Sequence, residues 1–261
     1  MSLPNTDEIH GANATIAIDW HRYPACGLCR AFAGLTLAFV PIRTFQARYL
    51  PGMPFDPDAG ARPLTLVAAS FSAPLLAAAE IKKVNTFKSR KRQLEWMAGR
   101  LAAKTLAADT ADQAGPLPDT IIAYHPEGAP YVDHQPSRSL SISHAGGYAI
   151  AGLARSDQTA LGLDIEKTQA LDIESILPVA FSDRERRRLD PADRYRFFEC
   201  WTLKEAYLKY LGRGFRENLK AIEILEGTTI RHAGQIVAGL QVRTFQPFPG
   251  YTLAIVFGPT P

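Results

Sequence analysis

The sequence has 261 residues, of which 46% are hydrophobic and 21% are charged. This is enough for one large globular domain or two of ordinary size. The net charge of +3 is too small to indicate nonspecific binding to nucleic acid, so we expect no nucleic-acid partner. With three cysteines, the chain has no disulfide framework and fits a reducing compartment, which predicts a cytoplasmic protein.

The first residues are acidic rather than basic, which is not typical of an export signal. The longest apolar run, residues 31–40, is too short to span a bilayer. We therefore expect neither a secretion signal nor a membrane partner.

Residues 1–62 are expected to form an N-terminal extension of unclear role. They contain a possible strand at residues 35–42, and the Pro- and Gly-rich stretch 51–63 is typical of a linker. Cys26 and Cys29 have the spacing of a zinc or redox pair, but no second Cys or His pair lies near them in the sequence. Ordinary reduced thiols are the favoured interpretation, and a metal or redox role is the alternative.

A folded domain is expected from residue 63, with a buried strand at residues 64–69 and a helix at 86–108. The segment 82–104 carries many basic residues and a single acid, Glu95. These bases either form a solvated helix face or bind phosphates, for which Arg offers a forked donor and Lys a point charge. They are Lys82, Lys83, Lys88, Arg90, Lys91, Arg92, Arg100 and Lys104.

Three further strands are predicted at residues 120–124, 139–143 and 148–154. Alternation along the second of these places its serines on the outer face and His144 at the strand end, before two glycines. A ligand backbone could approach closely at such a turn. His144 is therefore either a structural histidine or part of a binding site.

The run from Leu161 to Glu166 predicts a strand that carries two carboxylates on one face. Asp164 and Glu166 share that face with Gly162, which is expected to leave it open to a ligand. Paired acids repel each other unless a cation lies between them, and oxygen ligands suit Mg²⁺ or Mn²⁺. The alternative is an edge strand with solvated acids.

A capping box formed by Ser182 and Glu185 predicts a helix start, and the arginine run that follows is either solvated or recognises an acidic partner. A second helix is predicted at residues 191–211, followed by strands at 221–225, 235–245 and 251–257.

The helix at 191–211 is apolar on nearly every side, so its charged residues Lys204, Glu205 and Lys209 are expected to line a cleft. The alternative is a surface ion pair between Glu205 and Lys209, which are four residues apart.

Three of these segments occur in a specific order: Ser141 to His144, Gly162 to Glu166, and Trp201 to Lys209. In this order they resemble the signatures of the 4'-phosphopantetheinyl transferases of the Sfp-like type. Those signatures are a Ser-x-Ser-His element, a Gly-x-Asp-x-Glu strand and a Trp-x-x-Lys-Glu-Ala helix with a later Lys. The resemblance covers residues 63–257 and says nothing about residues 1–62.

The resemblance implies an α+β fold of two similar halves, residues 63–158 and 159–261, packed as a pseudo-dimer with the active site in the cleft between them. Coenzyme A would bind in that cleft. Because each half would cover the other's apolar surface, we expect a monomer.

The resemblance also implies the reaction, in which the 4'-phosphopantetheine arm of coenzyme A is transferred to a serine of an acidic apo acyl or peptidyl carrier protein. Adenosine 3',5'-bisphosphate is released, and Mg²⁺ is required, with Mn²⁺ as a possible substitute. Fatty acid, polyketide and nonribosomal peptide synthesis all remain open as the pathway. The alternatives are a non-catalytic coenzyme A or nucleotide-binding protein and a metal-dependent diphosphate hydrolase.

Residue roles follow from the same resemblance. Asp164, Glu166 and Glu205 would hold the metal, and Glu205 would also be the base for the serine. Lys209 would steady phosphate charge, with Lys204 as a further catalytic side chain. The Ser-His element, Ser143 and His144, would touch the nucleotide end of coenzyme A, with Lys209 at its phosphates. Beyond the resemblance, we expect Lys88, Arg90 and Arg92 to hold the 3'-phosphate end together with His144. One departure is Ala129, because the family often has a basic residue between the Gly and Pro found here as Gly128 and Pro130.

Overall fold

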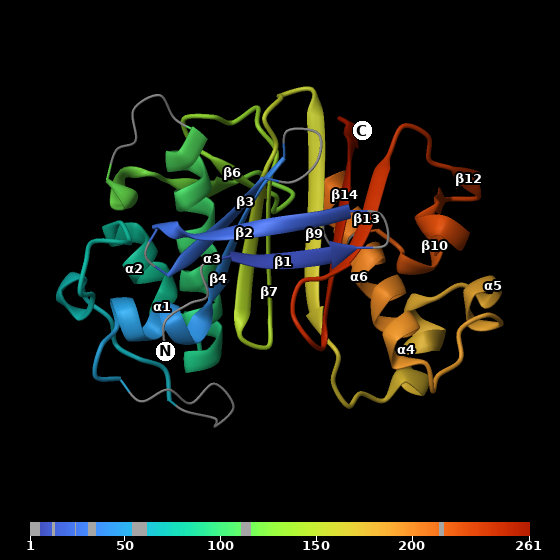
Figure 1. Ribbon diagram of the computed structural model, residues 1–261, viewed down its shortest axis with the longest axis horizontal. Helices are drawn as coiled ribbons and strands as arrows, with labels where there is room; N and C mark the ends of the chain where they lie inside the picture. Colours follow the sequence, from blue (N-terminus) through green and yellow to red (C-terminus); the bar gives the residue numbers. More distant parts are fainter. Residues whose placement is uncertain are drawn as a thin grey trace.

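The computed structural model describes residues 6–11, 14–23, 25–30, 35–53, 62–110, 116–213 and 217–261. It is a mixed fold in which helices cover a large antiparallel sheet (Figure 1). The helices are α1 (Ile42–Tyr49), α2 (Ala78–Val84), α3 (Arg90–Thr110), α4 (Ile173–Ala180), α5 (Asp183–Arg186) and α6 (Arg194–Leu211).

The main sheet has nine strands in the order β7-β8-β4-β3-β2-β1-β13-β14-β9, and all neighbours are antiparallel. Two small sheets pair β5 with β6, and β10 with β11 and β12. The strands of the main sheet are β1 (Thr6–Gly11), β2 (Ala14–Tyr23), β3 (Cys26–Arg30), β4 (Thr36–Pro41), β7 (Leu140–Ala145), β8 (Tyr148–Leu153), β9 (Thr159–Lys167), β13 (Gln241–Gln246) and β14 (Tyr251–Pro259). Those of the small sheets are β5 (Ile122–Tyr124), β6 (Pro130–Val132), β10 (Ile222–Ile224), β11 (Ile230–His232) and β12 (Gln235–Ile236).

The first and last strands of this order, β7 and β9, lie side by side and are joined by serine side chains (Figure 1). The hydroxyls of Ser139, Ser141 and Ser143 accept hydrogen bonds from the backbone N–H groups of β9, at 2.9, 3.0 and 3.4 Å. Each partner lies 22 residues further along the chain, so the two strands run in the same direction. We call this contact the serine seam. It closes the sheet where no backbone ladder does.

Three hydrophobic cores surround the sheet. One lies between the sheet and α3, one between the sheet and α6, and the third lies among β4, β9, β14 and their neighbours. Alternate residues of β4 divide between two cores, since Ala38 and Val40 belong to the first and Leu37 and Phe39 to the third. This burial on both faces explains the continuous apolar run of that strand.

Residues before position 63 therefore contribute to the first core. Phe45 of α1 and Val40 of β4 lie in the same cluster as Leu94 and Leu101 of α3. The first core thus extends across the boundary expected at residue 62. Most of the predicted linker, residues 54–61, lies outside the described residues.

The strand predicted at residues 64–69 is wrong. The backbone here bonds amide side chains instead of a neighbouring strand. The side chain of Asn85 hydrogen-bonds both the N–H and the C=O of Leu66, and the side chain of Gln93 hydrogen-bonds both backbone groups of Leu64. The backbone polar groups are satisfied without a ladder. A 3₁₀ turn, Ala68–Ser70, follows.

Most other predicted elements are confirmed. The capping box of Ser182 and Glu185 starts α5, and Gly212 ends α6 in the left-handed region, at a φ of 67°. The strand predicted at 235–245 is divided into β12 and β13, with Gly239 at a φ of 78° between them.

Gly162 is not open to a ligand, which corrects the expectation. A Cβ at this position would lie 1.9 Å from the carbonyl oxygen of Ala206 and 2.3 Å from the N of Tyr210, both in the α6 backbone. Glycine is required here because α6 packs directly on β9. This close approach brings the charged residues of α6 to the acidic face of β9.

The same buried lysine contact occurs beside α3 and beside α6. Lys104 Nζ lies 2.5 Å from Glu80 Oε2 and 3.1 Å from the carbonyl oxygen of Leu75. In the same way, Lys204 Nζ lies 2.7 Å from Glu185 Oε2 and 3.0 Å from the carbonyl oxygen of Ala180. Both carbonyls come five residues before the glutamate. Each glutamate also accepts a hydrogen bond, at 3.0 Å, from the backbone N–H three residues before it. The two parts of the chain thus repeat one structural device.

We expect the serine seam to be needed for stability. Ser141→Ala leaves the buried N–H of Leu163 without the acceptor that it has at 3.0 Å, which costs about 1 to 3 kcal/mol of unfolding free energy. Urea denaturation measures this loss. The exposed Ser137→Ala is the control and should unfold like the wild type. Equal midpoints for all three proteins would contradict the structural role of the seam.

Candidate functional site

The serine seam places Asp164 of β9 against Ser143 of β7. The Ser143 hydroxyl donates to Asp164 Oδ1 at 2.6 Å, and Lys209 of α6 donates to the same oxygen at 2.7 Å. Asp164 is buried, and its other oxygen, Oδ2, has no hydrogen-bond partner. One carboxylate thus joins three elements that are distant in the sequence.

Two further carboxylates lie near Asp164. Glu166, on the same face of β9, accepts a hydrogen bond at 3.2 Å from the indole Nε1 of Trp201. Burial, followed by the charge of Asp164, raises the pKa of Glu166 to about 7. The same two causes raise the pKa of Glu205 to about 7, and the Lys209 ammonium opposes both shifts. Mutual repulsion of this kind is typical of carboxylates that share a site.

The carboxylate oxygens of Asp164, Glu166 and Glu205 are chemically suited to bind a divalent cation. Asp164 Oδ2 and Glu205 Oε1 are buried oxygens without hydrogen-bond partners, and carboxylate oxygens are the ligands that Mg²⁺ prefers. In the part of the chain that the structure describes, no three His, Cys, Asp or Glu side chains already converge as a ligand cluster. The acids interact by charge, and Lys209 balances one of them.

A pocket of about 450 Å³, a volume typical of small-molecule sites, is lined by Glu205 and Lys209, whereas Asp164 and Glu166 are not among its lining residues. Its walls come from α3, β7, the turn between β5 and β6, and α6. Of the predicted site residues, Arg92, His144, Glu205 and Lys209 line it. The structure therefore brings together side chains that the sequence places more than 100 residues apart.

Other predicted residues are not in the pocket wall. Ser143 faces the seam and Asp164, while Lys88 is exposed just before α3 and Arg90 is the first residue of α3. The basic segment is not a single surface either, because Arg100 and Lys104 are buried.

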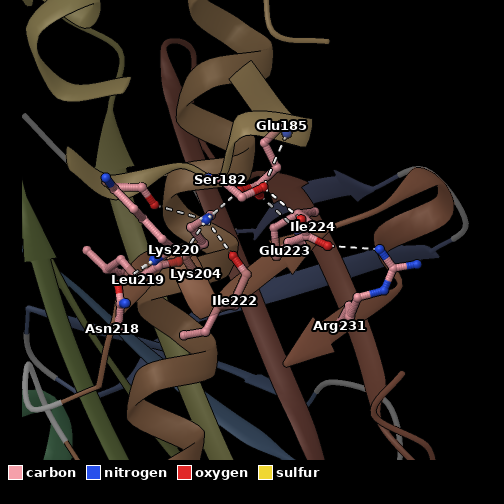
Figure 2. Close-up of polar contacts among 11 residues, drawn as sticks. Ser182, Glu185, Lys204, Asn218, Leu219, Lys220, Ile222, Glu223, Ile224 and Arg231 are labelled. Carbon is pink, nitrogen blue, oxygen red and sulfur yellow. Dashed lines mark hydrogen bonds and ion pairs between the residues drawn. The ribbon is translucent and has the colours of Figure 1, made fainter. Parts of the chain in front are cut away.

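Lys204 does not line the cleft with Glu205 and Lys209, so that expectation is wrong. Its side chain is fully buried, and its ammonium bonds Glu185 and the carbonyl oxygens of Ala180, Leu219 and Ile222 (Figure 2). Neighbouring residues on a helix point about 100° apart, so Lys204 and Glu205 face different surroundings. Lys204 holds α5, α6 and β10 together.

His144 is part of a chain of three polar side chains. Arg92 Nη1 lies 2.6 Å from His144 Nε2, and His144 Nδ1 lies 3.6 Å from Glu95 Oε2. Because a guanidinium only donates, Nε2 is the acceptor and the ring proton is on Nδ1, toward Glu95. Burial and the charges of Arg92 and Lys209 lower the pKa of His144 to about 4, so the ring is neutral at pH 7.

Glu95 was not predicted as a site residue. The sequence feature that could have identified it is that Glu95 is the one acid in the segment 82–104, which carries eight basic residues. It is buried, it lines the pocket, and burial raises its pKa.

Cys26 and Cys29 are ordinary buried thiols. They lie on opposite faces of β3, since Cys26 belongs to the first core and Cys29 to the third. Burial raises the pKa of each thiol to about 12. Protonated thiols on opposite faces of a strand do not form a metal or redox pair.

Comparison with known proteins gives a match to the family model of the 4'-phosphopantetheinyl transferase superfamily over residues 160–256. This span runs from β9 through α6 to β14, so it includes Asp164, Glu166, Glu205 and Lys209.

Among individual proteins, the chain is 28% identical to 4'-phosphopantetheinyl transferase psf-1 of Bacillus pumilus over 147 residues, which is 54% of this chain and 61% of that protein. It is 27% identical to 4'-phosphopantetheinyl transferase Sfp of Bacillus subtilis strain 168, over 49% of this chain and 58% of the relative. A third relative is the L-aminoadipate-semialdehyde dehydrogenase-phosphopantetheinyl transferase of Xenopus laevis, 28% identical over 54% of this chain and 50% of its own.

The chain spans about 60% of the length of the two Bacillus proteins. Across the described residues, no helix has both the length and the apolar character needed to cross a membrane. The matched span carries the three carboxylates and the lysine of the site. Over residues 160–256 the chain is therefore similar to the 4'-phosphopantetheinyl transferase superfamily, and the two Bacillus relatives that it resembles are 4'-phosphopantetheinyl transferases.

Proposed function

We propose that the protein transfers the 4'-phosphopantetheine arm of coenzyme A to a serine of an acidic apo carrier protein and releases adenosine 3',5'-bisphosphate. The observation that carries this proposal is that Glu205 and Lys209 line a pocket between α3 and α6, while Lys209 also bonds Asp164 and the charge of Asp164 acts on Glu166 and Glu205. Acids for a cation and bases for phosphates suit chemistry on a diphosphate.

In the proposed reaction the serine oxygen forms a bond to the phosphorus that bears the pantetheine arm, and the pyrophosphate P–O bond breaks. Glu205 accepts the serine proton, and its pKa of about 7 suits a base at neutral pH. Lys209, which now balances Asp164, lies where its ammonium can stabilise phosphate charge. Asp164, Glu166 and Glu205 would hold Mg²⁺, which when bound neutralises charge on the pyrophosphate.

The nucleotide end of coenzyme A is assigned to the pocket wall formed by Arg92 and His144. Arg92 supplies the charge there, because His144 is neutral at pH 7. Lys88, Arg90 and Ser143 remain proposed contacts at the entrance and along the seam.

We also propose that the two halves form a pseudo-dimer and that the protein is monomeric. The repeated lysine–glutamate contact, at Lys104 with Glu80 and at Lys204 with Glu185, supports an internal repeat. Because the core of the first half includes β4 and α1, residues 1–62 are proposed to belong in part to that half.

Glu205→Gln tests the proposed function directly. Loss of the base should lower transfer about 100- to 10,000-fold while the fold and much of the coenzyme A affinity remain. Transfer is followed by the mass of the carrier protein at saturating Mg²⁺, and the exposed Glu226→Gln is the control. A Glu205→Gln protein with a near wild-type rate would contradict the assignment of Glu205.

Arg92→Ala should weaken coenzyme A binding by ~1.5 to 3 kcal/mol, because a charged hydrogen bond to phosphate is lost. If the contact is to the 3'-phosphate, dephospho-coenzyme A should lose distinctly less affinity. Titration calorimetry with both ligands measures the difference, and Lys82→Ala, an exposed base on α2, is the control. Equal losses for both ligands would count against a contact to the 3'-phosphate.

The lowered pKa of His144 predicts a specific pH dependence of stability. As the pH falls from 6.5 to about 4, the unfolded chain binds a proton that the folded chain excludes, so this histidine lowers stability in that window. The charged groups facing it are Arg92, Lys91, Lys209 and Glu95.

His144→Gln removes this contribution, which should amount to about 1 to 3 kcal/mol. Glu166 and Glu205 act in the opposite sense but are common to both proteins, so the difference between wild type and variant isolates His144. Denaturation curves at pH 7 and pH 4.5 provide that difference. If the difference in unfolding free energy between wild type and variant is the same at both pH values, the pKa of His144 is not lowered by folding.

A further inference from the structure

Ser143 departs from the pattern that the other two serines of the seam follow. The hydroxyls of Ser139 and Ser141 each accept from the N–H of one β9 residue and donate to the C=O of the same residue, at 3.4 and 3.5 Å. Ser143 also accepts from a β9 N–H, that of Ile165. Its own proton, however, is donated to the side chain of Asp164 at 2.6 Å. The last serine of the seam therefore bonds a carboxylate of the site, whereas the first two bond only backbone groups.

The Ser143 hydroxyl is enclosed between β7 and β9. The side chain is buried, and Ser143 is not among the residues that line the pocket, although His144 beside it is. A serine hydroxyl has a single proton to donate, and here that proton is committed to Asp164. The geometry thus directs Ser143 to the carboxylate and not to the interior of the pocket.

Asp164 receives both of its donors on one oxygen. Ser143 of β7 and Lys209 of α6 donate to Oδ1, at 2.6 and 2.7 Å. The other oxygen, Oδ2, is buried and has no hydrogen-bond partner, which is unusual unless a ligand completes the site. Because the two donors come from different elements, they fix the plane of the carboxylate and keep Oδ2 as the unpartnered oxygen.

The two donors differ in how firmly they hold Asp164. The Lys209 side chain is long and flexible, is 30% exposed and lies in the pocket wall, where the proposed reaction uses its charge on phosphate. Ser143 is short and buried, and the N–H of Ile165 also holds its hydroxyl. When Lys209 bonds a phosphate, Ser143 is the donor that remains on Oδ1.

We infer that Ser143 is a positioning residue of the metal site, because its bond to Asp164 Oδ1 leaves Oδ2 as the oxygen that is available to a divalent cation. The hydrogen-bond partners of metal ligands orient those ligands and so contribute to metal affinity. This inference rests on the proposed function for the identity of the cation. It gives Ser143 a role at the metal end of the site, distinct from the nucleotide contact that the resemblance implies.

Ser143→Ala tests the inference through metal binding. Mn²⁺ is titrated into the protein, with and without saturating coenzyme A, and the free ion is measured by electron paramagnetic resonance. We expect the affinity for Mn²⁺ to fall about 10- to 100-fold, the usual effect of removing the hydrogen-bond partner of a metal ligand. Unchanged Mn²⁺ affinity would overturn the inference, and so would a wild-type protein that binds no Mn²⁺ in either state.

Ser139→Ala is the matched control. It removes a seam acceptor of the same kind, that for the N–H of Leu161 at 2.9 Å, and leaves the bond between Ser143 and Asp164 in place. This variant should lose stability but bind Mn²⁺ like the wild type. Equal losses of Mn²⁺ affinity in both serine variants would mean that the seam acts only through the fold, which contradicts a specific role for Ser143.

Titration calorimetry with coenzyme A in the presence of EDTA separates this role from a nucleotide contact. Without metal, Ser143→Ala should bind coenzyme A like the wild type. Weaker coenzyme A binding together with normal Mn²⁺ affinity would assign Ser143 to the nucleotide and overturn the inference.

Ser143→Cys is a second variant that nearly keeps the size of the side chain but has only a weak donor. It should also bind Mn²⁺ more weakly than the wild type does. Should Ser143→Ala fail to fold, wild-type Mn²⁺ affinity in Ser143→Cys would count against the inference.

The outcome is separable from that of the proposed function. A protein that binds Mn²⁺ in a Ser143-dependent way but modifies no carrier supports the inference and contradicts the transferase proposal. A wild-type protein that modifies carriers, while Ser143→Ala binds Mn²⁺ unchanged, supports the transferase and contradicts the inference.

Discussion

The contact between β7 and β9 is the constraint on which the site depends. These strands run in the same direction, and serine hydroxyls replace the backbone ladder between them. A hydroxyl can accept from a backbone N–H and still donate, and Ser143 uses this second capacity to bond Asp164. The interaction that closes the sheet thus also fixes the first carboxylate of the site. On the face of β9 that carries Asp164, Gly162 lets α6 approach closely enough for Lys209 to reach that carboxylate.

The site concentrates charges that oppose one another. Asp164, Glu166 and Glu205 repel, and this repulsion together with burial keeps the pKa values of Glu166 and Glu205 near 7. Close packing of α6 on β9 at Gly162, together with the bond from Lys209 to Asp164, holds these groups together. Where no chemistry is needed, the same fold pairs its buried charges closely, as in Lys204 with Glu185. Buried charges that have a close partner of opposite sign are structural here, whereas buried charges that repel their neighbours belong to the site. Residue type alone does not make this distinction.

Sequence patterns predicted the elements that carry the site, because β7, β9 and α6 have clear periodicity and recognisable ends. They could not assign Lys204, since an apolar helix with charged residues does not reveal which charge faces a cleft and which has a buried partner. The strand expected at residues 64–69 failed because Asn85 and Gln93 satisfy its backbone from elsewhere in the chain. Glu95 was not predicted as a site residue for a related reason: its role comes from a contact with the distant His144, and a single sequence shows only neighbours along the chain.

We propose that the acids and bases around the pocket serve a transfer reaction. Its most direct test is incubation of the wild-type protein with coenzyme A, Mg²⁺ and a panel of apo carrier proteins, followed by mass spectrometry and nucleotide analysis. We expect phosphopantetheine on one serine of at least one carrier and an equal amount of adenosine 3',5'-bisphosphate. Coenzyme A that is bound but never consumed, or that is cleaved equally well without a carrier, would contradict it.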